Sequence, residues 1–553
     1  MMEVSTAIQA VRAYHRLTKH HFHAYAPGPA FLDWDTQPNP YRRFVGAPTV
    51  ALPLAHETGP VMPYDALYAS AARVPEPFTL ESLGLFMELA LGLSAWKSFG
   101  PDRWALRNNP SSGNLHPTEG YLLLWRAVSP DLGPGLYHYA PYEHALERRA
   151  VLPEGEAARL CAAHLGSFGA LGLSSVVWRE AWKYGARAYR YVQLDVGHAL
   201  ASSRFAASVM GWALSCDVTP GDDMVAACLG IDREADFELA EREHPDLLAV
   251  LGTSDGAVGG VDWGRIAHSL AEWRGTANRL GAEYVEWPQI EQVLPAVHKS
   301  DEISRPFRAA PRRTSSALRS TDAPDACAII RQRRSAQRMD GRTGLPRAVF
   351  ERMLKRTLTL AQAPFDALPF PPAIQLLLFV HAVEGLEPGL YLLARTEDGG
   401  EAFHRACAGE GVGWDAVAGS QLPLYRLNAP LDLRRAASQL CCRQAIAGHG
   451  AFSLGMLANL DRAFENEGAW AYRRLYWEAG TIGQTLYLEA EAAGLSGTGI
   501  GCFFDDEVHR LLGLAEEGAW QSLYHFTVGK ALIDTRLVSE PPYAHLESGR
   551  APE

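Results

Sequence analysis

Short apolar runs and longer segments with helical spacing alternate along the chain, and together they predict a mixed α and β fold. The run Tyr121-Leu122-Leu123-Leu124-Trp125 is typical of a buried strand. Apolar residues recur at helical spacing from Leu80 to Trp96. Two long helices are predicted over about 189 to 210 and 472 to 493, each ending at a glycine, the residue that most often follows a helix.

The second half of the chain repeats the pattern of the first. Residues 188–197 (AYRYVQLDVG) match residues 471–480 (AYRRLYWEAG) at a shift of 283 positions, from 188 to 471. The same shift relates three further pairs, and a fourth motif recurs nearby: Gly211 and Gly494, Asp222-Asp223 and Asp505-Asp506, Leu229-Gly230 and Leu512-Gly513, and Pro134-Gly135-Leu136-Tyr137 with Pro388-Gly389-Leu390-Tyr391. We therefore predict two fused, related α+β domains that pack as a pseudo-twofold dimer, as identical subunits would.

A chain of 553 residues is too long for a single hydrophobic core. Residues 296–326 are polar, rich in proline and serine, and without periodicity, as interdomain linkers are. The predicted N-terminal domain therefore spans 1–295, the linker 296–326, and the C-terminal domain 327–553.

Charge and cysteine usage exclude several classes of function. A net charge of −12 argues against a nucleic-acid partner, because neutralising phosphates requires a concentrated basic face. Eight cysteines are scattered without a C-x-x-C pair, so the sequence predicts neither a zinc site nor a disulfide framework. No metal is expected at the cluster of His20, His21 and His23, which fits a solvated or packed face better. With no signal-peptide pattern and no long apolar run, we expect a cytoplasmic protein without a membrane span.

A polar loop precedes the predicted strand at Tyr121 and is the first candidate binding element. It reads Pro110-Ser111-Ser112-Gly113-Asn114, and its residues favour turns and caps. Small hydroxyl groups, an amide and accessible backbone N–H groups suit a flat, hydrogen-bonding ligand. The alternative is an ordinary connection between two elements.

Two stretches of the second half could also hold a ligand. Arg333-Arg334-Ser335 combines guanidinium groups with a hydroxyl group, which suits a phosphate, although a basic run alone is usually a solvated surface. Gly499-Ile500-Gly501-Cys502 would let the backbone approach a ligand closely. This second stretch follows a helix, so it is not a dinucleotide fingerprint.

These stretches together resemble the nitroreductase family, above all its tandem, SagB-type branch of FMN-dependent azoline dehydrogenases. The resemblance implies that FMN is the cofactor and that Arg333, Arg334 and Ser335 grip its phosphate. Gln337 stands where the family usually has Lys or Arg, so Arg338 or Arg536 would supply the missing charge. The resemblance implies that residues 110–114, here called the serine loop, contact the flavin through Pro110, Ser111, Ser112 and Asn114. It also implies that the backbone N–H groups of Gly499, Ile500, Gly501 and Cys502 face flavin N5 and O4.

The features of the two halves are complementary. The first half has the serine loop but no Arg-Arg-Ser run, and its counterpart of the glycine stretch is Cys216-Asp217-Val218-Thr219. The second half has the phosphate-binding run Arg333-Arg334-Ser335, but residues 361–372 stand where the serine loop would be. We therefore expect one FMN per chain, clamped between the domains.

The resemblance also implies a catalytic pair, Lys183-Tyr184. A lysine partly removed from water has a lowered pKa and can share a proton with a neighbouring phenol. By itself such a pair is usually a surface feature, but it looks like the Lys-Tyr pair of the SagB-type enzymes. The matching positions of the second half are Asn466-Glu467.

Three functions remain open. The first is an FMN-dependent dehydrogenase or oxidase that converts a thiazoline or oxazoline of a peptide-derived natural product to the azole. The second is an NAD(P)H-dependent reductase of nitro, quinone or activated-alkene substrates. The third is a non-catalytic flavin-binding subunit of a complex with other peptide-modifying enzymes.

Overall fold

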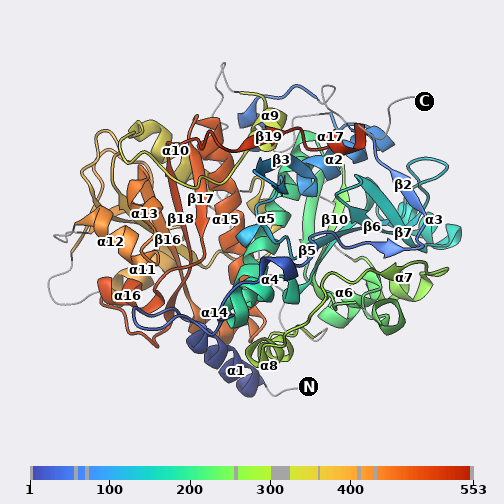
Figure 1. Cartoon of the computed structure of the whole chain (residues 1–553), viewed down its shortest axis with the longest axis horizontal. Helices are drawn as coiled ribbons and strands as arrows, with labels where there is room; N and C mark the ends of the chain where they lie inside the picture. Colours follow the sequence, from blue (N-terminus) through green and yellow to red (C-terminus); the bar gives the residue numbers. More distant parts are fainter. Residues whose placement is uncertain are drawn as a thin grey trace.

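The computed structural model describes residues 4–54, 60–68, 74–238, 240–253, 260–300, 324–358, 361–407, 413–427 and 432–547. Residues 301–323, the greater part of the predicted linker, lie outside these ranges. Each half of the chain contains a seven-stranded sheet, and two long helices lie between the sheets (Figure 1).

Six strands of each sheet follow the same order, and all neighbouring strands are antiparallel. The outer edge strand differs, because β2 precedes the other strands of its sheet in the chain whereas β14 lies between β13 and β15. In order, the first consists of β2 (Thr49–Ala51), β7 (Ala145–Val151), β6 (Gly135–Ala140), β5 (Thr118–Leu124), β8 (Ser167–Ser175), β10 (His244–Gly252) and β9 (Ala213–Asp217). The second consists of β14 (Trp414–Ala416), β15 (Leu424–Leu427), β13 (Gly389–Leu393), β12 (Ile374–Val380), β16 (Phe452–Asn459), β18 (Trp520–Gly529) and β17 (Ser496–Ile500).

The repeated Pro-Gly-Leu-Tyr motif lies at equivalent places in the two sheets. It begins β6 in one half and β13 in the other. The Tyr137 hydroxyl donates to the Gly133 carbonyl oxygen at 2.8 Å, and the Tyr391 hydroxyl donates to the Glu387 carbonyl oxygen at 2.7 Å. The sequence repeat is therefore also a repeat of local structure.

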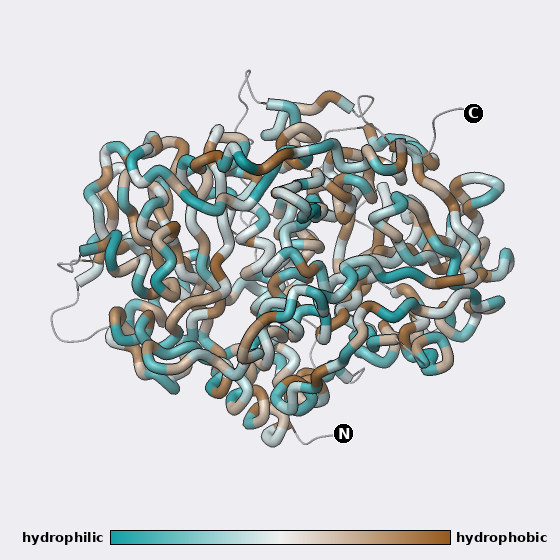
Figure 2. The backbone as a smooth tube through the Cα atoms, viewed as in Figure 1, coloured by the Kyte–Doolittle hydropathy of each residue, from teal (hydrophilic) through white to brown (hydrophobic). Residues whose placement is uncertain are grey.

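The helices cover the sheets and join the halves. In the first half they are α1 (Val4–Leu17), α2 (Leu80–Leu91), α3 (Glu154–Ala163), α4 (Val177–Tyr184), α5 (Ala188–Val209), α6 (Asp222–Leu229), α7 (Trp263–Ser269) and α8 (Pro288–Ala296). In the second half they are α9 (Ala326–Gln332), α10 (Arg347–Thr357), α11 (Glu397–Ala406), α12 (Leu433–Leu440), α13 (Ala445–His449), α14 (Leu460–Glu467), α15 (Ala471–Ala492), α16 (Asp505–Leu511) and α17 (Ala544–Glu547). Hydrophobic and hydrophilic positions alternate along most of the chain (Figure 2), as expected where elements bury one face.

The two predicted long helices are α5 and α15, and each ends where the sequence places its glycine. Gly211 and Gly494 follow them with φ values of +67° and +69°. The Trp212 N–H donates to the Ala207 carbonyl oxygen at 2.8 Å, and the Leu495 N–H donates to the Ala490 carbonyl oxygen at 2.9 Å. These bonds satisfy carbonyl groups that the helix end would leave unpaired.

Helices α5 and α15 touch each other through a pair of equivalent glycines. A Cβ atom on Gly197 would lie 2.3 Å from the Trp477 carbonyl oxygen, and one on Gly480 would lie 2.2 Å from the Leu194 carbonyl oxygen. The two contacts are equivalent, because Gly197 and Leu194 lie 283 positions before Gly480 and Trp477. The interface is thus reciprocal, as in a contact between identical subunits.

Two buried ion pairs between the halves are reciprocal in the same way. The Arg190 Nη1 atom lies 2.7 Å from Asp505 Oδ1, and the Arg473 Nη1 atom lies 2.6 Å from Asp222 Oδ2. Arg187 also donates to Asp505, at 3.0 Å. The two guanidinium groups hold the pKa of Asp505 well below its usual range despite its burial.

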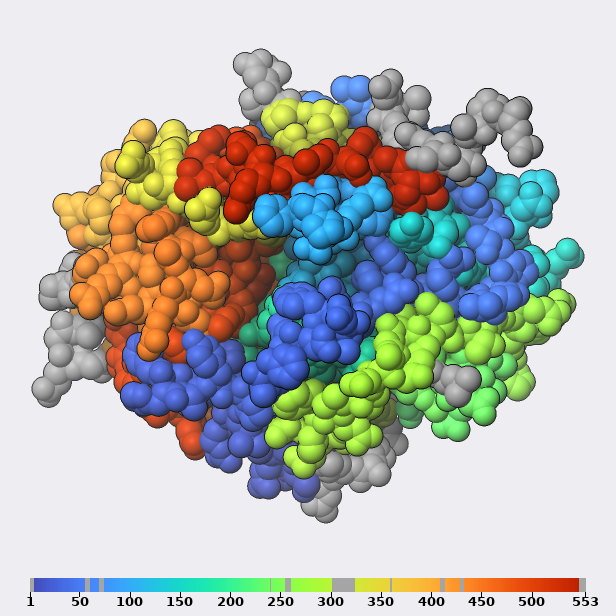
Figure 3. Space-filling model, viewed as in Figure 1, coloured from blue at the N-terminus to red at the C-terminus, as the bar shows by residue number. Residues whose placement is uncertain are grey.

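Each end of the chain crosses to the opposite half. In α1, the His15 Nδ1 atom lies 3.0 Å from the Tyr472 hydroxyl of α15. At the other end, β19 (Val538–Glu540) pairs with β3 (Leu93–Phe99), which also pairs with β4 (Asp102–Arg107). The short strands β1 (Phe44–Val45) and β11 (Thr276–Ala277) form a separate pair. The crossing segments tie the two halves into one body (Figures 1 and 3).

The predicted helix over residues 80–96 is wrong beyond Leu91. Gly92 ends α2, and its N–H donates to the carbonyl oxygens of Met87 and Glu88. The chain then forms β3, which pairs with the next strand, β4, and with the distant β19. The spacing of apolar residues did not reveal this strand, because strand formation depends on its pairing partners as well as on local pattern.

Replacement of Asp505 by Asn should destabilise the protein by about 3 to 5 kcal/mol, because two buried guanidinium groups would lose their charged partner. Urea unfolding followed by circular dichroism would measure the change. The control is Asp398→Asn, at an exposed pair with Arg462, which should change the free energy of unfolding by less than about 1 kcal/mol. Equal effects of the two changes would contradict the importance of the buried pair.

Candidate functional site

Two adjoining cavities lie where the halves meet, and they share three lining residues: Pro110, Ser111 and Ser335. The inner cavity, of about 260 Å³, contains Ser112 from the first half and the stretch 498–502 from the second. The outer cavity, of about 540 Å³, contains Arg333 and Arg334. The surface is hollowed where the two halves meet (Figure 3). The site is therefore composite, and neither half forms it alone.

The serine loop is held in place by a carboxylate of α5. The Ser112 N–H and hydroxyl groups each donate to Asp195 Oδ1 at 3.2 Å. The Ser111 Oγ accepts the His116 N–H at 2.8 Å, and the Asn114 Nδ2 donates to the Ala105 carbonyl oxygen at 2.9 Å. These hydrogen bonds order the loop, which presents Ser112 to the inner cavity and Ser111 to both cavities.

Lys183 and Tyr184 lie directly against this loop. A Cβ atom on Gly113, whose φ is +62°, would lie 2.7 Å from the Tyr184 hydroxyl and 3.1 Å from Lys183 Nζ. Tyr184 lines the inner cavity, and Lys183 stands immediately behind Gly113. Partial burial lowers the pKa of Lys183, although Glu180 opposes the shift. The predicted pair is therefore located beside the cavity.

The predicted glycine stretch forms the opposite wall of the inner cavity. It begins in the edge strand β17 and continues into the loop before α16. A Cβ atom on Gly499 would lie 1.7 Å from the Tyr524 hydroxyl, and one on Gly501 would lie 2.3 Å from the Tyr191 ring. Any larger residue at either position would displace these side chains. Within the described residues, the N–H groups of Gly501 and Cys502 have no hydrogen-bond acceptor.

The outer cavity is basic. Lys97, Arg107, Arg333 and Arg334 line it, with Glu491 and Asp534 as the acidic members. Among the described residues, no carboxylate lies within ion-pair distance of Arg333 or Arg334. Burial lowers the pKa of Arg333, and that of Arg334 to about 10. Two poorly compensated cations in a partly enclosed space favour an anionic ligand.

The structure gathers nearly all of the predicted site residues around these two cavities. The inner cavity takes Pro110, Ser111, Ser112, Tyr184, Ser335, Gly499, Ile500, Gly501 and Cys502, and the outer cavity takes Asn114, Arg333, Arg334 and Gln337. Arg536 is the exception. Its guanidinium group bonds to Asp534 at 2.7 Å, and its side chain is 70% exposed. Its expected phosphate contact is not supported, and Lys97 and Arg107 supply the additional charge instead.

Several lining residues were missed by sequence reasoning. From α5 come Tyr191, Asp195 and His198, whose i, i+4, i+7 spacing on one helical face could have indicated them. Tyr487 accepts the Gly499 N–H at 2.9 Å and lies 2.8 Å from the Ser335 hydroxyl. Tyr524 reaches the cavity from β18. These last contacts depend on packing between distant elements and carry no local signal.

Asp195 and Glu180 form a buried acidic pair beside the cavity. Burial raises the pKa of Asp195 to about 7, although the hydrogen bonds from the serine loop oppose the shift. Burial and the nearby Asp195 charge raise the pKa of Glu180 well above its usual value. Both carboxylate oxygens of Glu180 are without a hydrogen-bond partner in the described structure. The site can therefore hold a proton near neutral pH.

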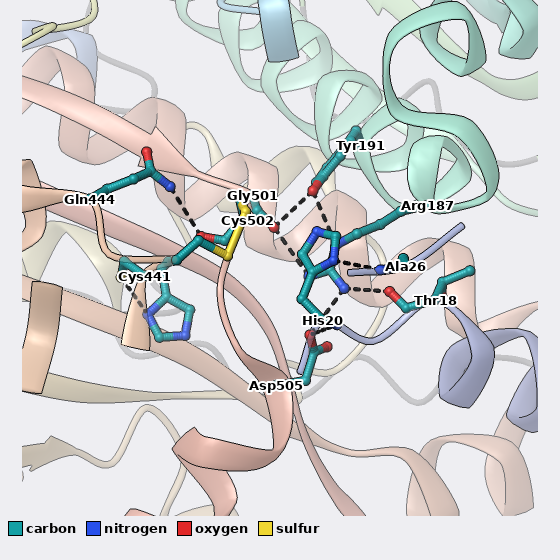
Figure 4. Close-up of a disulfide and its surroundings, with 12 residues drawn as sticks. Thr18, His20, Ala26, Arg187, Tyr191, Cys441, Gln444, Gly501, Cys502 and Asp505 are labelled. Carbon is teal, nitrogen blue, oxygen red and sulfur yellow. Dashed lines mark hydrogen bonds and ion pairs between the residues drawn. A yellow bond between two sulfur atoms is a disulfide. The ribbon is translucent and has the colours of Figure 1, made fainter. Parts of the chain in front are cut away.

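The sequence predicts no disulfide framework, but the structure contains one disulfide. Cys442 and Cys502 are joined by a disulfide, with their Cα atoms 5.8 Å apart (Figure 4). Sequence spacing could not indicate this bond, because the two residues lie 60 positions apart and come together only through the fold. The other six cysteines are not part of a disulfide.

The side chains at the equivalent positions of the other half are different. Counting back 283 positions from Tyr487 leads to Arg204, which donates to Asp366 at 3.0 and 2.7 Å. Asp366 lies in the short helix Phe365–Ala367, within the segment that replaces the serine loop, and this helix contacts both α5 and β9. In place of the Lys-Tyr pair, Glu467 forms an ion pair with Arg474.

The site fits the cofactor that the sequence resemblance implies. A flavin mononucleotide has a flat ring system with hydrogen-bond acceptors and a phosphate at the end of a chain. The inner cavity offers small hydroxyl groups and free backbone N–H groups, and the adjoining outer cavity offers cations without a carboxylate partner. The donor set therefore suits FMN, with the ring in the inner cavity and the phosphate in the outer one.

Comparisons with known proteins bear on the family and the fold. Residues 330–530 match the model of the nitroreductase family. The structure of a nitroreductase-like protein from Anabaena variabilis aligns over 95% of this chain and 99% of its own, with a TM-score of 0.65 and 22% identity. This likeness establishes the fold of nearly the whole chain.

Two other structures align over less than half of the chain. A nitroreductase-like protein from Ralstonia eutropha covers 42% of it and 99% of its own chain, with 17% identity and a TM-score of 0.28. The Escherichia coli microcin synthetase McbBCD complex covers 45% of it and 94% of its own chain, with 18% identity and a TM-score of 0.26. TM-scores this low do not establish a shared fold. No curated protein sequence matches the chain.

None of the helices in the described ranges is both long and apolar enough to span a bilayer. The same residues contain no group of three or more His, Cys, Asp or Glu side chains arranged to hold a metal ion.

Asp195 should make the stability of the apoprotein depend on pH. Its pKa of about 7 in the folded state lies above the value of about 4 for an unfolded aspartate. The folded chain therefore holds this proton more tightly, and the carboxyl group lowers stability as pH rises from about 4 to about 7, by up to about 1.4 kcal/mol per pH unit. Asp195→Asn should remove this loss, so its stability relative to the wild type should increase across that range and level off above it.

Urea unfolding of both proteins at several pH values would measure the difference. The matched control is Asp131→Asn, at an exposed residue. A stability difference for Asp195→Asn that stays constant from pH 4 to 8 would show that Asp195 does not hold the proton.

Proposed function

We propose that the protein is an FMN-dependent oxidoreductase whose single flavin is bound between the two halves. The observation that carries this proposal is that Ser112 of the first half and Ser335 of the second line the same cavity. The nitroreductase family match of residues 330–530 supports the class of reaction.

We infer that the halves pack about a pseudo-twofold axis near Gly197 and Gly480. The reciprocal glycine contacts and ion pairs support this arrangement. A symmetric pair would have two cofactor positions. The Arg204–Asp366 pair and the segment around it occupy the second position, which supports one flavin per chain.

Each half would hold a different part of the cofactor. Arg333, Arg334 and Ser335 would bind the phosphate, while the serine loop and the N–H groups of Gly501 and Cys502 would orient the ring. FMN, when bound, supplies a centre at N5 that accepts or donates hydride. The protein then needs to position the substrate, exclude water and move a proton.

Lys183 and Tyr184 are placed to move that proton. The lowered pKa of Lys183 increases the fraction of neutral amine that can act as a base. Burial raises the pKa of Tyr184, so its phenol stays protonated and can donate a hydrogen bond. Glu180 and Asp195 lie behind the pair and can take up or return a proton.

The substrate class proposed from the sequence resemblance is an azoline in a peptide-derived natural product, oxidised to an azole. Removal of a proton by Lys183, with a hydrogen bond from Tyr184 and hydride transfer to the flavin, would accomplish this oxidation. The alternative is an NAD(P)H-dependent reductase, which the family match of the C-terminal domain also accommodates.

The purified protein should bind FMN at a ratio of one per chain, measured from its visible spectrum and protein concentration. Arg333→Ala should weaken binding by at least about tenfold, the size of one charge-assisted hydrogen bond. Arg536→Ala is the matched control and should bind FMN normally, because its side chain lies outside the cavities. A ratio of two, or equal effects of the two changes, would contradict the composite site.

Lys183→Ala should retain FMN and lose about 10²- to 10⁴-fold in turnover, the usual contribution of a general base. Oxygen uptake with a thiazoline-containing peptide would measure the oxidase reaction, and NADPH consumption with a quinone would measure the reductase reaction. Full activity of the variant on both substrates would remove Lys183 from the mechanism. Turnover only with NADPH would favour the reductase.

A further inference from the structure

We propose that Cys442 and Cys502 form a reversible dithiol–disulfide couple in the wall of the inner cavity, opened by an external dithiol, and that this bond sets how tightly the cavity holds FMN. The first part concerns only residues of this chain. The second part rests on the proposed function.

The disulfide between Cys442 and Cys502 lies in the wall of the inner cavity. Cys502 lines the inner cavity together with Ser112 and Asp195. Cys442 lies in the loop between α12 and α13, and the Cα separation of 5.8 Å is usual for a disulfide. Both residues are only partly buried, so a small reductant can reach the pair. Figure 4 shows the bond beside the turn at Gly501.

A neighbouring thiol does not compete for the bond. Cys441 is buried, and its Sγ lies 3.6 Å from His525 Nδ1. Burial raises the pKa of the Cys441 thiol to about 12, so it stays protonated and is a poor nucleophile. Apart from the partly buried Cys161, the other free cysteines are also buried. An external thiolate therefore has one accessible disulfide to attack.

The cavity wall at Gly501 and Cys502 is held from two sides. On the first half, Tyr191 donates to the Gly501 carbonyl oxygen at 3.0 Å, and Arg187 donates to it at 3.1 Å. On the second half, Gln444 donates to the Cys502 carbonyl oxygen at 3.2 Å, and the disulfide provides the covalent connection. Reduction would leave the Gln444 hydrogen bond as the direct contact of Cys502 on that side, flanked by the bond from the Phe504 N–H to the Leu440 carbonyl oxygen. The N–H groups that orient the flavin would then be less firmly placed.

The redox step is an ordinary thiol–disulfide exchange. A thiolate of the reductant attacks one sulfur, a mixed disulfide forms, and the bond between Cys442 and Cys502 breaks. The second thiolate of the reductant then displaces the protein thiol. Two electrons pass from the dithiol to the protein, which gains two thiol groups, while the reductant becomes a disulfide. An oxidised dithiol reverses the reaction.

Alkylation of the folded full-length protein, followed by peptide mass analysis, tests the first part. Without reductant, iodoacetamide should leave Cys442 and Cys502 unlabelled and linked in one peptide pair. After dithiothreitol treatment both should be labelled while Cys441 is not, and oxidised dithiothreitol should restore the link. Labelling of both without reductant, or a link that dithiothreitol cannot open in the folded protein, would overturn the couple.

Fluorescence titration with FMN tests the second part. The reduced protein should bind FMN about tenfold more weakly than the oxidised protein, the equivalent of one net hydrogen bond. Cys442→Ser should show the weaker affinity with or without reductant, while Cys161→Ser should respond as the wild type does. Equal affinities in both redox states would overturn control by the bond. Absence of FMN binding in either state would refute the proposed function, and the alkylation result would still decide the couple.

Discussion

The close contact between α5 and α15 is the constraint on which the rest of the molecule depends. Gly197 and Gly480 allow the two helix backbones to meet where any side chain would collide with a carbonyl group. The buried pairs Arg190–Asp505 and Arg473–Asp222 fix the same contact on either side. Burying four charges is tolerable only because each has a partner at hydrogen-bond distance. This packing determines which loops of the two halves face each other.

The two halves carry different side chains at equivalent positions. On one side, small residues at Gly113, Gly499 and Gly501 leave room between the elements. On the other, Arg204 and Asp366 form an ion pair and satisfy each other's charge. The same backbone contact therefore supports a cavity in one place and a packed ion pair in the other. Side-chain volume and charge, with the fold unchanged, decide which side can hold a ligand.

Basic residues line the outer cavity, whereas buried acidic residues lie beside the inner cavity. Arg333 and Arg334 create a cationic end without carboxylate partners, which suits a phosphate. Asp195 and Glu180, buried at the other end, have raised pKa values and so can hold a proton near neutral pH. Anion binding and proton transfer are thus separated in space, although both depend on the same desolvated interface.

The sequence by itself determined the repeat, the two long helices and most of the residues that the fold gathers around the two cavities. These features depend on local spacing and on residue types such as Gly, Arg and Ser, whose chemistry is visible in a single stretch. The strand β3, the exclusion of Arg536, the contributions of Asp195, Tyr487 and Tyr524, and the Cys442–Cys502 bond were decided only by the tertiary structure. The contacts of Asp195 and Tyr524, the pairing of β3 with β19 and the disulfide join segments far apart in the chain, and the energy of such contacts depends on packing that no local pattern encodes.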